Sequence, residues 1–378
     1  MKERVYNALL GDRDEKVDII TLHHVTNFGS MLQTYATQYI IEKLGDKAEI
    51  IDFVPEGLTL YRALFPKNEQ RSWFSKCIRF LPKLLCNSIQ YVILNKFLTK
   101  YIHLSDIKYS SYEQLLENPP KADIYMSGSD QIWNTQNSNK ENDLNAYYLQ
   151  FAPKDKRKIA YAGSFGRKSF SAEMRHKIQK FLQEYDMVSV RESYGLEILK
   201  TVGIDNGVHV LDPTLLLNRN EWGNFIRPVR EKKYLFVYNL NRNPVIKKYA
   251  QIIANEKQLA IVNFSDTFEF IKGAKNRLIN GPEDFVSYIA HAEYVITDSF
   301  HGTAFSINFN KQFVCVRAPK YNSRLESILN LVGLNERLFK SEIDLEIANK
   351  AIIYSKINKI IDENRRISID YLRNALEG

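Results

Sequence analysis

The chain has 378 residues, of which 44% are hydrophobic, and a formal net charge of +8. This length exceeds the size at which one hydrophobic core usually keeps growing, so two domains are expected, and the ordinary composition excludes disordered and fibrous proteins. The N-terminus is charged, and no uncharged apolar window reaches about 18 residues, so neither a signal peptide nor a spanning helix is predicted and we expect a cytoplasmic protein.

Cysteine content and charge distribution argue against further classes. Cys77, Cys86 and Cys315 form neither a CxxC pair nor an even set, which is atypical of disulfide frameworks and of structural zinc sites. Residues 57–105 contain eight basic residues and one acidic residue, a net +7. A basic excess confined to one segment argues against a broad phosphate-binding surface, so we expect no nucleic-acid partner.

Short apolar runs rich in β-branched residues alternate with helical patterns in the first part of the chain. Strands that are buried on both faces and joined by helices imply a parallel sheet of βαβ units. The expected strands are 17–22, 48–53, 122–128, 158–164, 187–192 and 207–213. The expected helices include 30–45, 171–185 and 193–203. Together these elements predict an N-terminal domain over residues 1–225.

Residues 57–105 interrupt this series as a basic amphipathic insert. Within it, SWFSKCIRFLPKLLCNSIQYVILNKFLTKY interleaves apolar residues with Lys and Arg, and Trp73 lies near one end. This pattern is typical of a helix in the headgroup layer of a membrane. An amphipathic helical pair that packs on the domain is the alternative. RNA binding is a third interpretation, although no known RNA-binding module surrounds the segment.

A second series of strands and helices follows a cluster of Asn, Gly, Pro and charged residues at 220–231. The expected strands are 233–240, 259–264, 293–299 and 312–316, with a helix over 282–292 and another from Gly302. This series predicts a C-terminal domain over 226–345, followed by a C-terminal helical segment over 346–378. We therefore expect an α/β protein with two domains whose parallel sheets face each other across a cleft.

Polar residues follow the ends of most predicted strands. Ligands of open α/β sheets bind beyond the carboxyl ends of the strands, where helix N-termini offer N–H groups and a partial positive charge. The segments concerned are TLHHVTNFGS, SGSDQIWN, AGSFG, SVRE, LDPTLLL and TDSFHGT. Their composition indicates an anion or sugar site better than it indicates packing.

Two of these segments have simple alternatives. The glycine and hydroxyls of SGSDQ (127–131) could hold phosphate or sugar, but an ordinary capped turn explains them equally well. Ser30 is expected to be the N-cap of the first helix, beside Asn27. Of the adjacent His23 and His24, at most one can face the cleft, because neighbouring side chains of an extended chain point in opposite directions.

Three charged residues stand out as candidates. Arg191 ends a buried strand and presents a fork suited to carboxylate or phosphate, with a salt bridge to Glu192 or to a neighbouring carboxylate as the alternative. His301 closely follows a strand end with Asp298 beside it, where an imidazole could act as a general acid; a satisfied core histidine is the alternative. Arg324 is a second cationic candidate, with ordinary surface charge as its alternative.

Taken together, NFGSMLQTYATQYIIEKLG, SGSDQIWN, SFG, SVRE, LDPTLLL and ITDSFHGTAFSINFNKQFV resemble the polysaccharide pyruvyl transferase family, in order from about Asn27 to Val316. The resemblance implies a GT-B-like fold of two Rossmann-like domains with the site in the cleft. It implies transfer of a pyruvyl unit from phosphoenolpyruvate to a sugar, which forms a pyruvate ketal, in exopolysaccharide biosynthesis. By resemblance, His301 matches the catalytic histidine and Arg191 matches an arginine associated with donor binding.

The chain departs from the family pattern at one position. Some members have an arginine two residues before the histidine, where this chain has Ser299. We therefore expect Arg324 and the helix start at Gly302 to hold the anionic groups of the donor.

The chemistry needs an acid, donors for phosphate and carboxylate, and a positioned acceptor. We expect His301 to be the acid or a phosphate partner, and Asp298 to orient or charge its imidazole. The expected donor-binding residues are Arg191, Arg324, Ser299, Gly302 and Thr303, and the expected acceptor-binding residues are Asn27, Ser129 and Asp130. No metal and no cofactor are expected, and phosphoenolpyruvate is a co-substrate.

The expected partners are a sugar or lipid-linked oligosaccharide acceptor and, through residues 57–105, the inner face of a membrane. Two other functions fit the same fold, because a fold alone does not determine function. One is a glycosyltransferase that uses a nucleotide sugar, which would release nucleoside diphosphate instead of phosphate. The other is a non-catalytic binding partner in polysaccharide assembly, which the departure at Ser299 supports.

Overall fold

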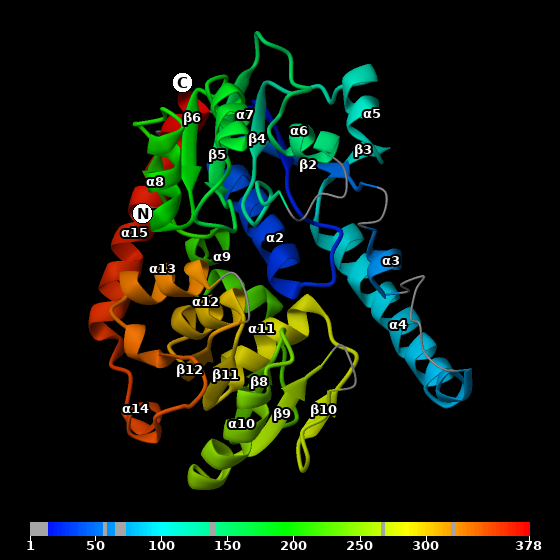
Figure 1. Ribbon diagram of the computed structural model, residues 1–378, viewed down its shortest axis with the longest axis vertical. Coiled ribbons are helices and arrows are strands. Elements are labelled where there is room, and N and C mark those ends of the chain that lie inside the picture. Colours follow the sequence, from blue (N-terminus) through cyan, green and yellow to red (C-terminus); the bar gives the residue numbers. More distant parts are fainter. Residues whose placement is uncertain (1–13, 56–58, 65–72, 136–140, 266–268, 319–321) are drawn as a thin grey trace. The chain divides into compact units, whose positions relative to one another are not determined.

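The structure is a computed structural model that describes residues 14–55, 59–64, 73–135, 141–265, 269–318 and 322–378, with the backbone alone for 73–81 and 141 (Figure 1). The chain divides into two units. Unit 1 comprises Met1–Ala63, Leu98–Leu216 and Asn364–Gly378, and unit 2 comprises Leu64–Phe97 and Leu217–Glu363.

The bounds of these units differ from those of the predicted domains. The chain passes from unit 1 to unit 2 at Leu216, before the predicted position, and much of the basic insert belongs to unit 2. The end of the C-terminal segment belongs to unit 1. Packing explains the last two differences, because the Phe97 ring centroid lies 6.0 Å from that of Phe225 in unit 2, and Tyr371 donates a hydrogen bond to the Ala160 carbonyl in unit 1.

In the described residues, unit 1 is built on a seven-stranded parallel sheet in the order β3-β2-β1-β4-β5-β6-β7. The strands are β1 Lys16–Ile20, β2 Lys47–Phe53, β3 Leu104–Tyr109, β4 Ile124–Ser127, β5 Arg157–Gly163, β6 Met187–Val190 and β7 Val208–His209. The predicted parallel sheet of βαβ units is confirmed, with β3 as an additional edge strand. Its order reverses between β1 and β4, which defines the switch point of unit 1.

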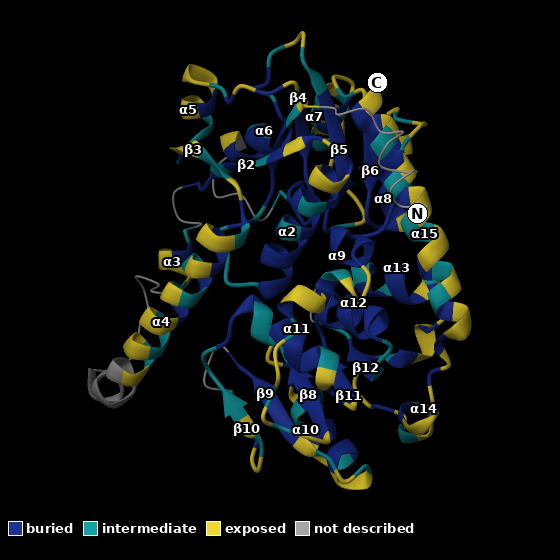
Figure 2. Cartoon of the chain, turned by 180° about the vertical axis from the view of Figure 1, so that it is seen from behind, coloured by how far each residue is buried: buried dark blue, intermediate teal, exposed yellow. Residues whose placement is uncertain are grey.

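Helices connect these strands and cover the sheet. They are α2 Phe28–Lys43, α5 Tyr112–Glu117, α6 Glu141–Tyr147, α7 Ala172–Leu182, α8 Ser193–Thr201 and α9 Pro213–Leu216. The prediction that Ser30 is the N-cap of the first helix is wrong. Asn27 is the N-cap, because its side chain accepts the N–H of Gly29 at 3.0 Å. Ser30 instead lies in the first turn of α2, a helix that is buried along most of its length (Figure 2).

In the described part of unit 2, a six-stranded parallel sheet has the order β10-β9-β8-β11-β12-β13. The strands are β8 Tyr234–Tyr238, β9 Ala260–Phe264, β10 Lys275–Arg277, β11 Tyr294–Thr297, β12 Gln312–Val316 and β13 Leu338–Phe339. The helical elements are η1 Glu221–Phe225, α10 Pro244–Glu256, α11 Pro282–His291, α12 Phe300–Asn308, α13 Ser323–Leu331, η2 Asn335–Arg337 and α14 Leu345–Asn349. The switch point of unit 2 lies between β8 and β11.

Two long helices belong to both units. After the short α3 Leu60–Leu64, α4 runs over Trp73–Tyr101 as a single helix that contains Pro82, in place of the helical pair considered above. The C-terminal helix α15 runs over Tyr354–Glu377. Within the residues that the structure describes, no helix combines the length and the apolar character that a bilayer crossing requires.

Candidate functional site

The Asp130 carboxylate links the chain segments on the two sides of the switch point in unit 1. It follows β4 closely, and its carboxylate accepts hydrogen bonds from the hydroxyl of Ser30 in α2 and from the N–H of Gln131 at 2.8 Å. Thr21, which directly follows β1, donates its hydroxyl to the Ser129 carbonyl at 2.9 Å. The segments that follow β1 and β4 are therefore linked by direct hydrogen bonds at the position where open α/β sheets bind ligands.

The backbone of Asp130 adopts the left-handed conformation, with φ of 72°. This region costs an L-residue about 1–2 kcal/mol, although aspartate tolerates it better than most residues. A bridge pairs Asp130 with Gly163 at the end of β5, and the contacts with Ser30 and Gln131 hold the side chain. Backbone strain that several contacts hold in place is concentrated at functional sites, so Asp130 is a strong site candidate.

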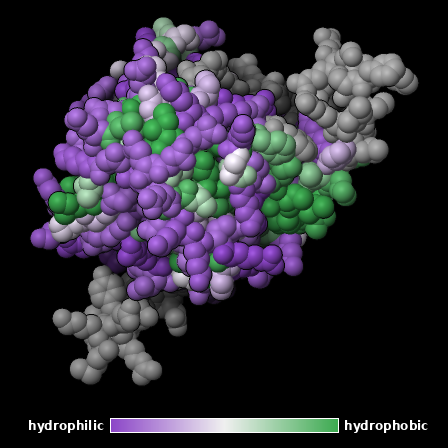
Figure 3. All heavy atoms as spheres, turned by 90° about the horizontal axis from the view of Figure 1, so that it is seen from below, coloured by the Kyte–Doolittle hydropathy of each residue, from purple (hydrophilic) through white to green (hydrophobic). Residues whose placement is uncertain are grey.

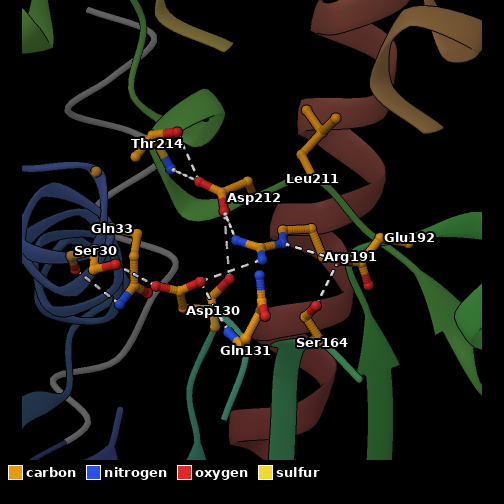
Figure 4. A network of polar contacts seen from close by, with 12 residues as sticks. Ser30, Gln33, Asp130, Gln131, Ser164, Arg191, Glu192, Leu211, Asp212 and Thr214 are labelled. Carbon is orange, nitrogen blue, oxygen red and sulfur yellow. Dashed lines mark hydrogen bonds and ion pairs between the residues drawn. The ribbon is translucent and has the colours of Figure 1, made fainter. Parts of the chain in front are cut away.

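Arg191 lies buried among three carboxylates (Figure 4). Its Nη1 lies 2.6 Å from Asp212 Oδ2, Nη2 lies 3.4 Å from Asp130 Oδ1, and Nε lies 3.5 Å from Glu192 Oε1. Burial alone would lower the pKa of Arg191, but Asp212, Glu192 and Asp130 raise it above its usual range. The guanidinium is therefore charged and forms ion pairs with these carboxylates, as in the salt-bridge alternative considered for this residue.

Neutral donors complete the same network. Ser164 donates its hydroxyl to Glu192 Oε1 at 2.6 Å. Asp212 Oδ1 accepts the N–H and the hydroxyl of Thr214 at 3.0 and 2.7 Å, and its Oδ2 lies 3.5 Å from the hydroxyl of Ser129. Buried charges need such partners to offset the loss of water. The network thus places Ser129, a predicted acceptor residue, beside Asp212.

The other predicted residues that follow β1 have structural partners. Asn27 caps α2. His23 is buried, and its Nε2 lies 3.0 Å from Asp52 Oδ1, while Nδ1 of His24 accepts the N–H of Leu60 at 3.0 Å. Burial and the neighbouring His23 lower the pKa of His24 to about 4, so this ring is neutral at neutral pH. Both histidines thus help to shape the segment that leads from β1 to α2.

Asp298 has the corresponding position in unit 2. It directly follows β11, and its two carboxylate oxygens accept the backbone N–H groups of Leu240 at 2.8 Å and Asn241 at 3.0 Å, which follow β8. Burial raises the pKa of Asp298, although the hydrogen bonds from Asn241 and Leu240 oppose the shift. The structure thus gives this carboxylate a different partner from the imidazole of His301 that we expected.

Three predicted donor residues form the start of α12. Ser299 is the N-cap and accepts the N–H of Gly302 at 3.3 Å. Thr303 donates its hydroxyl to the Ser299 carbonyl at 3.0 Å and lies 2.9 Å from Cys315 Sγ. A Cβ on Gly302 would lie 2.6 Å from Thr297 Oγ1, so close packing alone requires glycine here. These residues determine the shape of the helix N-terminus.

His301 and Arg324 meet at one aromatic ring. His301 is buried in the first turn of α12, and its ring centroid lies 5.1 Å from that of Phe300. The guanidinium of Arg324, from α13, lies 5.8 Å from the centroid of the same Phe300 ring, a distance typical of a cation–π contact. The structure therefore brings the predicted acid and the predicted cation of unit 2 together through Phe300.

Among the members of the unit 1 network that the sequence interpretation missed are Asp212 and Gln33. It named the segment LDPTLLL but not Asp212, although an acid that follows one buried strand and an arginine that follows its neighbour meet at the same sheet edge. It also missed Gln33, whose side-chain amide donates to Thr21 Oγ1 at 2.9 Å and to the Ser30 carbonyl at 3.0 Å. A polar residue inside a helix gives no such signal.

Comparisons with known proteins address the fold and the family. The family model for polysaccharide pyruvyl transferase matches residues 27–318, and no curated protein matches the chain. A candidate UDP-N-acetylglucosamine 2-epimerase from Listeria monocytogenes is 10% identical, with 96% of this chain and 91% of that chain covered and a TM-score of 0.52. S. aureus MnaA, in a co-structure with UDP, is 13% identical, with 94% and 90% covered and a TM-score of 0.51.

At these identities the two structures show similarity of fold alone. They agree with an α/β chain that holds two parallel sheets, and the predicted GT-B-like fold class is confirmed. The family match extends over more than half of the sequence and includes Asp130, Arg191 and His301. The chain belongs to the polysaccharide pyruvyl transferase family.

Proposed function

We propose that this protein transfers a pyruvyl group from phosphoenolpyruvate to a sugar of a surface polysaccharide or of its lipid-linked precursor, and that a pyruvate ketal is formed. Membership in a family of transferases is the observation that carries the proposal. The different charges of the two switch points also support donor binding in unit 2 and acceptor binding in unit 1.

The reaction determines which groups are needed. A proton added to the methylene carbon of phosphoenolpyruvate makes C2 electrophilic, two sugar hydroxyls add to C2, and phosphate leaves. The two hydroxyl protons balance the new methyl hydrogen and the proton on the released phosphate. Catalysis therefore requires a proton donor, cationic or N–H groups for the anionic donor, and acceptors for the hydroxyl protons.

We assign proton delivery to His301. Its ring is buried in the first turn of α12, and imidazole changes protonation state in the physiological pH range more readily than other side chains. Asp298 supports this site indirectly, because it holds the turn that follows β8.

Donor binding is assigned mainly to unit 2. Arg324 supplies a guanidinium beside Phe300 and His301, and helix N-termini favour anions. Ser299, Gly302 and Thr303 act by setting the backbone of this turn.

Acceptor binding is assigned to unit 1, at Asp130 with Ser129 and Asn27. The network around Arg191 holds three carboxylates against one guanidinium. This excess of negative charge disfavours a phosphorylated, carboxylated donor, whereas carboxylates readily accept hydrogen bonds from sugar hydroxyls. Arg191 then serves the reaction as a positioning residue for Asp130 and not as a direct donor ligand.

We further infer that the acceptor is presented on a lipid at the inner face of a membrane. Residues 57–105 concentrate the basic excess of the chain, and clustered Lys and Arg attract the anionic lipids of that leaflet. In this proposal phosphoenolpyruvate comes from the cytoplasm, so the donor and the lipid-linked acceptor are supplied on the same side of the membrane.

The test measures phosphate release from phosphoenolpyruvate with a panel of free and lipid-linked oligosaccharides, with products identified by mass. The expected product is a sugar that is heavier by one pyruvate ketal. Release of nucleoside diphosphate from a nucleotide sugar would instead support a glycosyltransferase. Saturable sugar binding without consumption of either donor would support a non-catalytic partner in polysaccharide assembly.

A further inference from the structure

The part of α4 whose side chains are described exposes an apolar stripe. Leu85, Ile89 and Val92 are 62%, 39% and 62% exposed. Their spacing of i, i+4 and i+7 places them on one side of the helix, and Lys96 continues the same line at i+11. Figure 3 shows hydrophobic side chains gathered on the right of the face seen from below, and Figure 1 draws α4 on that side. We call Leu85, Ile89 and Val92 the α4 stripe.

The opposite side of α4 is anchored in unit 2. The side-chain amide of Gln90 donates to the Asn280 carbonyl at 2.6 Å and accepts the Asn280 N–H at 3.0 Å. Leu94 is fully buried, and Phe97 packs near Phe225. A reciprocal pair of hydrogen bonds with one backbone residue sets the rotation of the helix about its axis. The exposure of the stripe therefore follows from how α4 is packed.

The charges of this segment favour one kind of partner. Between Pro82 and Tyr101 the sequence contains Lys83, Lys96 and Lys100 and no acidic residue, and the last two lysines are exposed. Aliphatic side chains bordered by lysines match the boundary between the acyl chains and the phosphates of an anionic bilayer. A protein groove would account for the apolar stripe but not for the complete absence of acids.

We propose that α4 is the surface through which the protein rests on an anionic membrane. The α4 stripe enters the outer part of the acyl layer, and Lys96 and Lys100 reach the lipid phosphates. The helix lies along the membrane surface, as is typical of a helix with an apolar side bordered by lysines. This inference rests on the membrane presentation proposed above and deepens it by naming the surface that meets the lipid; its test needs neither phosphoenolpyruvate nor a sugar.

The full-length protein is mixed, without substrates, with vesicles of phosphatidylcholine or of phosphatidylcholine with phosphatidylglycerol, and is sedimented. Sedimentation is expected to require phosphatidylglycerol and to fall as salt is added. Leu85→Asp and Val92→Asp are each expected to weaken vesicle partitioning about tenfold, through the loss of apolar burial. Lys96→Gln and Lys100→Gln are each expected to weaken it about fivefold.

Matched controls replace aliphatic side chains that are exposed elsewhere. Ile353→Asp and Ile367→Asp, at positions that are 75% and 47% exposed, are expected to leave partitioning unchanged. Circular dichroism and the denaturation midpoint verify that all variants are folded. Partitioning that survives in both α4 stripe variants, or that falls equally in the controls, overturns the proposal.

Two further outcomes also contradict a membrane role. Equal binding to pure phosphatidylcholine would remove the electrostatic argument. Absence of vesicle binding, together with self-association that Leu85→Asp abolishes, would assign the α4 stripe to a second copy of the chain. Phosphate release with a free oligosaccharide, measured on the same variants, separates this inference from the proposed reaction, because each can fail while the other holds.

Discussion

The switch points of the two units use an aspartate in the same place but give it different partners. In unit 1, Asp130 follows β4 and accepts the hydroxyl of Ser30 in α2. In unit 2, Asp298 follows β11 and accepts the backbone N–H groups of Leu240 and Asn241. Each carboxylate joins the segments on the two sides of a reversal in strand order.

This difference has consequences for sequence tolerance and for charge. Every residue except proline supplies a backbone N–H, so the contact in unit 2 depends on the identity of one residue, Asp298. The contact in unit 1 depends on side chains from several elements, including Ser30, Asp130 and Arg191. Unit 1 also buries an excess of carboxylate, whereas Arg324 adds positive charge near His301 in unit 2. The first environment suits hydroxyl groups and the second suits an anion.

The largest expected effect tests the division of roles between the units. His301→Ala is expected to reduce kcat about 10²–10⁴-fold with a modest change in the KM for phosphoenolpyruvate, because it removes a proton donor. Asp130→Asn is expected to raise the KM for the sugar instead. Steady-state phosphate release measures both, and a rise in the phosphoenolpyruvate KM of His301→Ala at unchanged kcat would make His301 a binding group.

The next effect concerns the buried charge of unit 1. Arg191→Met is expected to lower the free energy of unfolding by about 3–5 kcal/mol, because it leaves buried carboxylates without their cation. Arg337, the matched buried arginine of unit 2, donates to the backbone carbonyls of Ala348 and Lys350, so Arg337→Met is expected to cost about 1–3 kcal/mol. Denaturant titration compares the two, and equal losses would show that the carboxylates of unit 1 impose no special requirement.

A third prediction compares the central strands of the two sheets. The middle of β1 buries Asp18, where the middle of β8 buries Phe236. Burial raises the pKa of Asp18 to about 7, although Lys16 Nζ, 3.3 Å from Oδ1, opposes the shift. The folded protein therefore holds this proton more tightly than the unfolded chain does, and stability falls as pH rises from about 4 to about 7.

Asp18→Asn removes this dependence. The stability advantage of the variant over the parent is expected to increase by about 2–3 kcal/mol from pH 5 to pH 8. Denaturation at several pH values measures the difference. Parallel stability curves for the two proteins would contradict the prediction.

The smallest expected effect is at the switch point of unit 2. Asp298→Ala is expected to cost about 1–3 kcal/mol, because two backbone N–H groups lose their acceptor. Asn241→Ala retains its N–H and is expected to cost less. Ser30→Ala in unit 1 removes a side-chain donor and is expected to be destabilising, so a harmless Ser30→Ala would remove the contrast between the units. Denaturation midpoints give all three values.

The sequence by itself predicted the parallel α/β organisation, because strands buried on both faces leave apolar runs that are visible without any tertiary contact. It missed β3, an edge strand in which half of the LSDIKY residues are exposed, and the short strands β10 and β13, which have three and two residues. The start of α2 was predicted too late in the chain because Asn27 and Ser30 are both good N-cap residues. Only the backbone geometry shows that Asn27 caps the helix.

The order of polar segments along the chain was enough to indicate the family and the positions of the candidate residues. Tertiary structure alone decided which residues pair, since Ser30 and Asp130 are 100 positions apart and Gln90 and Asn280 are 190 apart. The same contacts assign part of the basic insert to unit 2 and expose the α4 stripe. Periodicity reports the side of a helix that is apolar, but only packing determines whether that side is covered or left open to a partner.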